Sequence, residues 1–183
     1  FNDPSDSTQE RLYLISAYVT ERDFEKGINI ATRKRTDTTW SVKGKLPIPG
    51  LDIDGKYVGY YMSQDQNVVI ISYEGSDSEG EEDLYVSIKD EEGWTEPENL
   101  GSTINSEGFE ISPFLSKNND TLYFSSDGFK GQGDADIFYS VRKGKWTSWS
   151  KPVNLGKTIN TPYFDGYFSL IDNRAIWSSN REG

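Results

Sequence analysis

The chain has 183 residues, a formal net charge of −11, 34% hydrophobic and 14% aromatic residues, and neither cysteine nor histidine. This length suits one domain or part of one, and the aromatic content is too high for a disordered chain. The two missing residue types exclude disulfides, iron–sulfur clusters, cysteine- or histidine-ligated zinc, and thiolate- or histidine-based nucleophilic catalysis. Any chemistry must therefore use carboxylates, hydroxyls, lysines or a metal ion with oxygen ligands.

The negative charge is concentrated in one segment. Residues 74–110 contain 13 acidic residues and one base, Lys89, so the remainder of the chain is nearly neutral. This field repels nucleic acid, and we expect no nucleic-acid partner, although a basic partner or divalent cations would be attracted. A solvated acidic loop that aids solubility is the simpler interpretation. The longest apolar run, Val68–Ile71, is far below the roughly 20 residues of a membrane span, so none is expected.

Short runs rich in Val, Ile, Tyr and Phe alternate along the chain with clusters of Gly, Asp, Asn and Ser, and no window has sustained helical spacing. We therefore predict an all-β chain. The predicted strands are, in chain order, Leu12–Tyr18, Gly27–Thr32, Tyr57–Ser63, Val68–Tyr73, Leu84–Ile88, Thr121–Ser125, Ile137–Val141, Tyr167–Ile171 and Arg174–Ser178.

These strands belong to an internal repeat. Asn99–Asn105 and Asn154–Asn160 are identical at six of seven positions, at an offset of 55 residues. Other segments recur with similar offsets: Leu122–Ser126 as Ala175–Ser179 and Val69–Ser72, Asp83–Ser87 as Asp136–Ser140, and Gly93–Pro97 as Lys145–Pro152 with a small insertion. The period is about 53 residues and holds about four strands, which is typical of a blade of a β-propeller.

The repeat also predicts the core. Residues at repeated apolar positions should be buried between sheets: Ile70, Phe124 and Trp177 at one position, and Leu84 and Ile137 at another. The tryptophans that recur in register are expected in the same core: Trp40, Trp94, Trp146 and Trp177. The predicted strands Leu122–Ser125 and Ile137–Val141 should lie side by side in one antiparallel sheet.

The repeat resembles the WD40-like propeller repeat of TolB-type proteins of the Bacteroidota cell envelope, which are often joined to an OmpA-like peptidoglycan-binding domain. The segments that carry the resemblance are Ser112–Ser116, Leu122–Ser126, Gly131–Phe138, Trp146, Pro152–Gly156 and Ile159–Thr161. It covers about residues 55–183 well and 11–54 loosely, and departs from the family at the turns 64–67 and 117–120. It implies a periplasmic, outer-membrane-associated or cell-surface location.

The blade count predicts an incomplete ring. Residues 1–183 form one propeller region of about three and a half blades, whereas closed propellers usually have four to eight. We expect the chain to be part of a longer polypeptide. Residues beyond Gly183, a second copy of the chain or a partner would then complete the ring, with a strand beside Arg174–Ser178 in the first case.

One loop is a candidate calcium site. Asp127, Asp134 and Asp136 are separated by glycines, and three such carboxylates can converge on a hard cation. Asp83 occupies the position of Asp136 one repeat earlier, which favours instead a structural role in which the carboxylate accepts hydrogen bonds from loop amides. Ca²⁺ is the only cofactor that the sequence brings into consideration.

Two further groups of residues were weighed as sites. Four acids near the starts of inner strands are the candidates for a propeller glycosidase, which needs a carboxylate pair: Asp52, Asp54, Glu110 and Asp165. Four aromatic residues that break the repeat are candidates for contact with a protein partner or a glycan: Phe129, Trp149, Tyr163 and Phe164.

The functional hypothesis is a non-enzymatic β-propeller scaffold that mediates protein–protein interaction in a bacterial cell envelope, with a protein or peptidoglycan-associated complex as partner. A carbohydrate-binding or carbohydrate-hydrolysing propeller is the alternative, and a calcium-dependent adhesion or structural module is a third possibility. The missing catalytic residue types favour the scaffold, and an axial pocket with two carboxylates and exposed aromatic residues would favour the carbohydrate alternative.

Overall fold

The computed structural model describes residues 1–16, 27–51, 53, 57–172 and 174–181, and all of the regular structure among them is β-strand. The strands are β1 (Asn2–Asp3), β2 (Asp6–Ser16), β3 (Gly27–Lys34), β4 (Ser41–Lys45), β5 (Gly59–Met62), β6 (Val68–Tyr73), β7 (Asp83–Ile88), β8 (Glu98–Asn99), β9 (Glu110–Leu115), β10 (Thr121–Ser126), β11 (Asp136–Val141), β12 (Val153–Asn154), β13 (Asp165–Ile171) and β14 (Arg174–Ser179). The all-β prediction is confirmed. Within these ranges no helix is long and apolar enough to cross a membrane.

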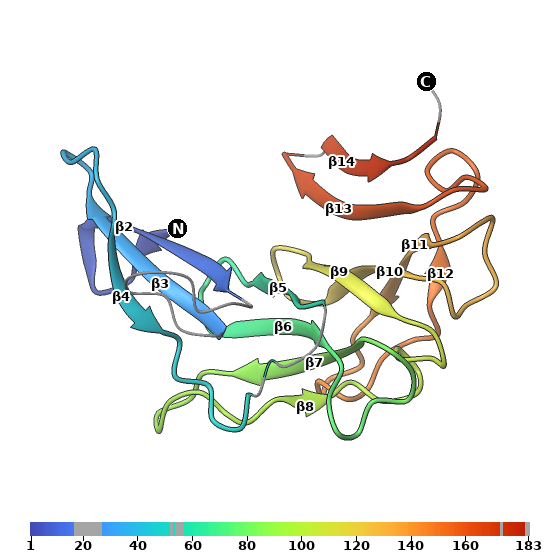
Figure 1. Cartoon of the computed structure of the whole chain (residues 1–183), viewed down its shortest axis with the longest axis horizontal. Coiled ribbons are helices and arrows are strands. Elements are labelled where there is room, and N and C mark those ends of the chain that lie inside the picture. The colour runs from blue at the N-terminus through green and yellow to red at the C-terminus, as the bar shows by residue number, and fades with distance from the viewer. Residues whose placement is uncertain (17–26, 52, 54–56, 173, 182–183) are drawn as a thin grey trace.

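Consecutive strands pair with one another in three four-stranded antiparallel sheets, β1–β4, β5–β8 and β9–β12, and β13 pairs with β14 (Figure 1). The predicted neighbours of the third sheet are confirmed, since Phe124 in β10 is opposite Phe138 in β11. Each of the three sheets is a meander, because every strand returns beside the one before it. Four strands in each repeat agree with the sequence period.

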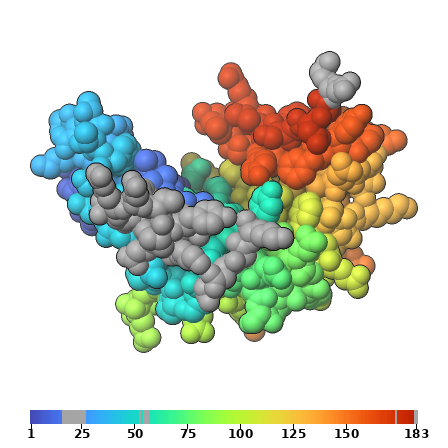
Figure 2. All heavy atoms as spheres, viewed as in Figure 1, coloured from blue at the N-terminus to red at the C-terminus, as the bar shows by residue number. Residues whose placement is uncertain are grey.

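Successive sheets contact one another through strands near their starts: β2, the second strand of its sheet, and β5, β9 and β13, the first strands of theirs. β2 contacts β5, β5 contacts β9, and β9 contacts β13. The sheets therefore follow one another along an open arc, from the N-terminal sheet to the pair β13–β14 (Figure 1). In the space-filling view a gap separates the two ends of this arc (Figure 2).

The repeated loops Asn99–Asn105 and Asn154–Asn160 make the same contacts with their sheets. The side chain of Asn105 accepts a hydrogen bond from the Leu84 amide at 2.9 Å and donates to the Leu84 carbonyl at 3.1 Å. Asn160 makes the same pair of bonds with Ile137, at 2.8 and 2.9 Å. Because a buried backbone group without a partner is costly, this asparagine clamp explains why the loop sequence repeats almost unchanged.

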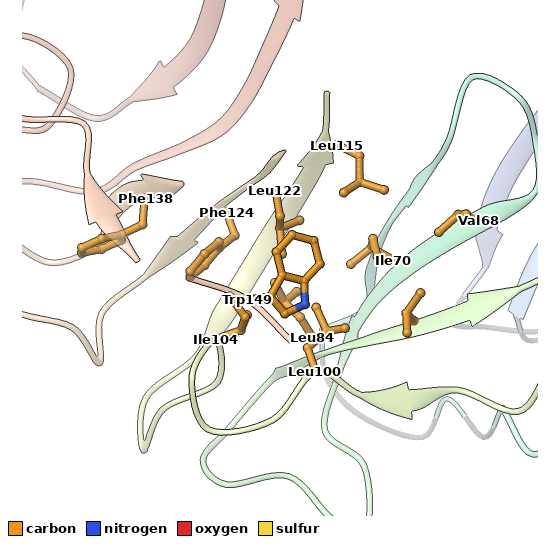
Figure 3. Packing of buried hydrophobic residues seen from close by; sticks show 11 residues of the cluster. Val68, Ile70, Leu84, Leu100, Ile104, Leu115, Leu122, Phe124, Phe138 and Trp149 are labelled. Carbon is orange, nitrogen blue, oxygen red and sulfur yellow. The ribbon is translucent and has the colours of Figure 1, made fainter. Parts of the chain in front are cut away.

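The main core lies between the second and third sheets (Figure 3). Ile70, Phe124, Leu84 and Ile137 are each completely buried, which confirms four of the five burial predictions. Each contributes roughly 1.5–3 kcal/mol through removal of apolar surface from water. The prediction for Trp177 is wrong, because its ring in β14 is only half-buried and one side of it lies against Arg181.

The tryptophan alignment needs correction. Trp94 pairs with Lys89, and the matching bridge one repeat later joins Arg142 to Trp149, not to Trp146. Trp149 is 4% exposed and belongs to the main core (Figure 3), whereas Trp146 is half-buried at its edge. An offset of 55 residues aligns Trp94 with Trp149 and Pro97 with Pro152 without a gap, whereas Lys89 and Arg142 are 53 residues apart. The insertion therefore lies in the turn before Trp149 and not between the tryptophan and the proline.

Candidate functional site

A buried carboxyl group lies where the third sheet begins. Glu110, the first residue of β9, is fully buried and accepts hydrogen bonds from the Ser106 amide (2.8 Å), the Ser106 hydroxyl (2.6 Å) and the Ser126 hydroxyl (2.6 Å). Burial raises the pKa of Glu110 to about 7 against the opposing effect of these bonds, and the charge of nearby Asp83 raises the pKa further. No basic side chain among the described residues pairs with this carboxylate.

Asp165, the first residue of β13, occupies the equivalent position one repeat later and has a counter-charge. Burial acts to raise its pKa, but hydrogen bonds from Ser179 and Thr161 and the charge of Arg181 outweigh burial and lower the pKa. The Arg181 guanidinium lies 3.1 Å from Asp165 Oδ1. At the position equivalent to Arg181 the preceding repeat has Gly128, where a Cβ atom would lie 1.8 Å from Ser106 Oγ, so no side chain fits beside Glu110.

Two of the glycosidase candidates, Glu110 and Asp165, are described in the structure, and their contacts indicate a structural role. Glu110 and Asp165 hold the loops that precede β9 and β13, are completely buried, and line neither of the cavities described below. Asp52 and Asp54, the other two candidates, lie outside the described residues.

A groove of about 590 Å³ runs over the faces of β5, β9 and β13, the first strands of three successive sheets. Its lining is mostly apolar and aromatic, with a few polar side chains such as Gln64 and Ser112, and the described lining contains no charged side chain. Residues that line it include Phe1, Tyr57, Tyr61, Met62, Ile111, Phe114, Tyr167, Phe168, Leu170 and Ile171. Several of these are exposed although apolar, such as Ile171 at 57%. Exposed apolar surface gathered in one concave region is typical of a binding site.

At one end the groove adjoins a second cavity of about 460 Å³, which we call the aromatic pocket. It is lined by Tyr57, Phe109, Phe164, Tyr167, Ile111, Glu81 and Glu82. The two cavities share Tyr57, Ile111 and Tyr167. The pocket therefore combines four aromatic rings with two carboxylates.

Three of the rings occupy one position of the repeat. Gly59, Ile111 and Gly166 face Ser72, Ser125 and Ser178, the equivalent serines of the second strands. The residues two positions before them are Tyr57, Phe109 and Phe164. Because the first strands lie side by side, one aromatic residue from each of three sheets reaches the same pocket.

Tyr167 is presented by a distorted strand. Its φ of 55° lies in the left-handed region, and β13 has a register shift between Gly166 and Ser169. Ser112, at the equivalent place in β9, also has a φ of 55°. A bulky residue in this region costs on the order of 1–3 kcal/mol, and such bulges commonly occur beside functional sites because they redirect a side chain. Here the bulge leaves Tyr167 59% exposed at the junction of the two cavities.

The structure gives the calcium candidates separate partners. Asp127 Oδ1 accepts the Phe109 amide at 2.9 Å, Asp136 Oδ2 accepts the Asn154 side-chain amide at 2.7 Å, and Asp134 is exposed. The Gln132 amide of the loop also donates to Asp136 Oδ2, which is the kind of bond predicted for a structural role. In the parts of the chain that are described, no three acidic side chains are grouped so as to hold a metal ion. Calcium binding stays a prediction.

The four aromatic contact candidates have different environments. Trp149 does not break the repeat, because it is equivalent to Trp94, and it is buried: its ring packs in the core and its indole N–H donates to the Trp146 carbonyl. Phe129 is half-buried and packs against the same core. Tyr163 is 47% exposed, and Phe164 is half-buried and lines the aromatic pocket. Whether any of them contacts a partner stays a prediction.

Sequence reasoning missed most of the aromatic pocket. Tyr57 and Phe109 were not singled out, although their spacing from Phe164 follows the repeat period and was a usable signal. Glu81 and Glu82 were seen only as part of the acidic segment.

No protein-family model and no curated protein matches the chain. Among solved structures the chain is similar to an α-L-arabinofuranosidase from Lactobacillus brevis, with a TM-score of 0.48 and 15% identity. The match covers 86% of this chain and 58% of that one, so this chain spans little more than half of its length. A likeness this distant says nothing about the activity of this chain.

Proposed function

We propose that this chain is part of a β-propeller that binds a protein partner in the groove at its centre and has no catalytic activity. The repeated four-stranded meanders favour this interpretation, as does the side-by-side order of β5, β9 and β13, the first strands of three successive sheets. In a propeller the first strands of the blades surround the axis. The groove over β5, β9 and β13 would then be the axial site.

A binding role fits the carboxylates of the described residues better than hydrolysis does. Canonical glycosidases place two carboxyl groups on either side of the scissile bond, roughly 5–9.5 Å apart. Glu110 and Asp165 are buried and hydrogen-bonded away from the groove. The carboxylates of the aromatic pocket, Glu81 and Glu82, are neighbours on a single loop and do not face each other across a cavity.

The apolar groove is the observation that carries the proposal. Met62, Leu170 and Ile171 give it an aliphatic lining beside the aromatic rings. Aliphatic surface suits the apolar side chains of a protein segment, because burial of both surfaces removes apolar area from water. A glycan partner is the alternative, which the exposed rings of Tyr57 and Tyr167 favour. The cell-envelope location rests on the family resemblance alone and is part of the proposal.

Site-directed photocrosslinking tests this function. A photoreactive phenylalanine analogue replaces Tyr167 in the groove or, as a control, Val153 in β12, which is 46% exposed and outside both cavities. In cells of the natural host, the Tyr167 position should give a discrete protein adduct that the Val153 position does not. A carbohydrate adduct at Tyr167 would favour the glycan alternative, and equal labelling at both positions would refute a specific groove.

A further inference from the structure

Within the part of the chain that the structure describes, the acidic side chains of the aromatic pocket have no counter-charge. Neither the Glu81 nor the Glu82 carboxylate has an ion-pair partner among the described residues, and no described lysine or arginine lines the pocket. Burial raises the pKa of Glu82, and the negative charges of Glu81, Glu74 and Asp127 raise it further. The described lining of the pocket therefore has a negative potential that no described basic side chain compensates.

The aromatic rings add to this preference for a cation. Tyr57, Phe109, Phe164 and Tyr167 surround the same cavity as the two carboxylates. The face of an aromatic ring carries negative charge from its π-electrons and attracts a cation within about 6 Å of its centre. Carboxylates and rings together favour a planar guanidinium, which stacks on a ring while its N–H groups pair with a carboxylate.

We propose that the aromatic pocket binds an arginine side chain of the protein partner, with Glu81 and Glu82 as its counter-charge and the rings as its stacking surface. This inference rests on the proposed function, since the arginine would belong to the segment that lies in the adjoining groove. The charge of residues 74–110, with 13 acidic residues against one base, complements a basic segment and would accelerate its approach.

The pocket can be tested with a minimal probe. N-acetyl-arginine amide carries the guanidinium, and N-acetyl-citrulline amide has nearly the same shape without the charge. Titration of the ¹⁵N-labelled chain with each, followed by two-dimensional NMR, should shift the amide signals of Glu81, Glu82 and Phe109 for the arginine probe only. The binding should weaken as salt is added, because the interaction is charged.

Matched variants separate the pocket from the general acidity of the chain. Glu81→Gln/Glu82→Gln should weaken binding of the arginine probe about tenfold or more, since the charge-assisted contacts are lost. Glu91→Gln/Glu92→Gln removes the same charge from two exposed residues outside the pocket and should change binding less than twofold. Phe164→Leu should weaken binding roughly two- to fivefold through the loss of a stacking face.

Three results would overturn the inference: equal binding of the citrulline probe, equal effects of the two double variants, or no shift at the pocket amides. The spectrum of each variant shows at the same time whether it is folded, so a loss of binding cannot be mistaken for unfolding. A protein adduct at Tyr167 without binding of the arginine probe would refute the arginine pocket and leave the proposed function in place. Binding of the probe without any adduct would refute the proposed function and the partner's arginine with it, and would leave only an affinity of the pocket for a guanidinium.

Discussion

Replacement of Glu110 by glutamine should remove a pH-dependent loss of stability. Burial raises the pKa of this carboxyl from 4.5 to about 7, aided by the charge of Asp83 and opposed by hydrogen bonds from Ser106 and Ser126. Unfolding exposes the group and restores the ordinary pKa. Between about pH 4.5 and 7 the folded chain therefore binds more protons than the unfolded chain. The stability that protonated Glu110 gives the folded chain is fully present below about pH 4.5 and is lost as the pH rises through 7.

The magnitude follows from the size of the shift. A difference of about 2.5 pH units, at 1.36 kcal/mol for each unit, corresponds to about 3 kcal/mol of unfolding free energy. Glutamine is neutral at every pH and can keep the local bonds, since its oxygen accepts the Ser106 amide while its NH₂ group donates to the Ser106 and Ser126 hydroxyls. The quantity to follow is the unfolding free energy of Glu110→Gln minus that of the natural chain. We expect this difference to increase by about 3 kcal/mol from pH 4 to pH 8.

Urea unfolding followed by tryptophan fluorescence at a series of pH values measures this difference. Glu107→Gln is the matched control, because it makes the same substitution at an exposed residue nearby and should follow the natural chain at every pH. Parallel pH profiles for the natural chain and Glu110→Gln would refute the assignment of a raised pKa to this carboxyl. So would a control variant that reproduces the effect.

Three more perturbations test the fold and the loops. Trp149→Ala should lower the unfolding free energy by about 3–5 kcal/mol in urea and Trp146→Ala by clearly less; the reverse order would restore the alignment drawn from the sequence. Asn105→Ala leaves the buried amide of Leu84 unbonded, while the Leu84 carbonyl keeps its bond from the Leu100 amide, and should cost about 1–3 kcal/mol in the same assay, whereas an unchanged value would disprove the clamp. For the calcium prediction, added Ca²⁺ should raise the melting temperature and Asp134→Asn should abolish the rise; no response to Ca²⁺ or chelator would remove that prediction.

The sheets were predictable because most strands are indicated both by their own apolar pattern and by the recurrence of that pattern in another repeat. Val68–Tyr73 was predicted with its observed bounds, since an uninterrupted apolar run bordered by turn residues has few other interpretations. Residues 110–115, by contrast, were not predicted as a strand. Their sequence includes Pro113, which lacks an amide hydrogen, and Ser112, whose left-handed backbone makes a bulge. Both features weaken the local strand pattern, whereas pairing with β10 and contacts with β5 and β13 hold the segment as a strand.

The aromatic pocket could not be predicted from local pattern at all. Tyr57, Phe109 and Phe164 stand in three different loops, and what joins them is the lateral contact between the first strands of three sheets. The repeat pattern also could not predict how deeply residues of the last repeat are buried. Trp177 occupies the same repeat position as Phe124 yet lies in a sheet of two strands, where less of the ring is covered.

The asparagine clamp has a consequence for how parts of the chain open. The amide of Leu84 is bonded to the side chain of Asn105, which belongs to the connection that leads into β9. Hydrogen exchange at this amide therefore reports release of the connection, even while β7 remains paired with β6. The Ile137 amide is in the same position with respect to Asn160 and β13. The smallest unit that opens cooperatively is then larger than one sheet, because it includes the segment that joins each sheet to the next.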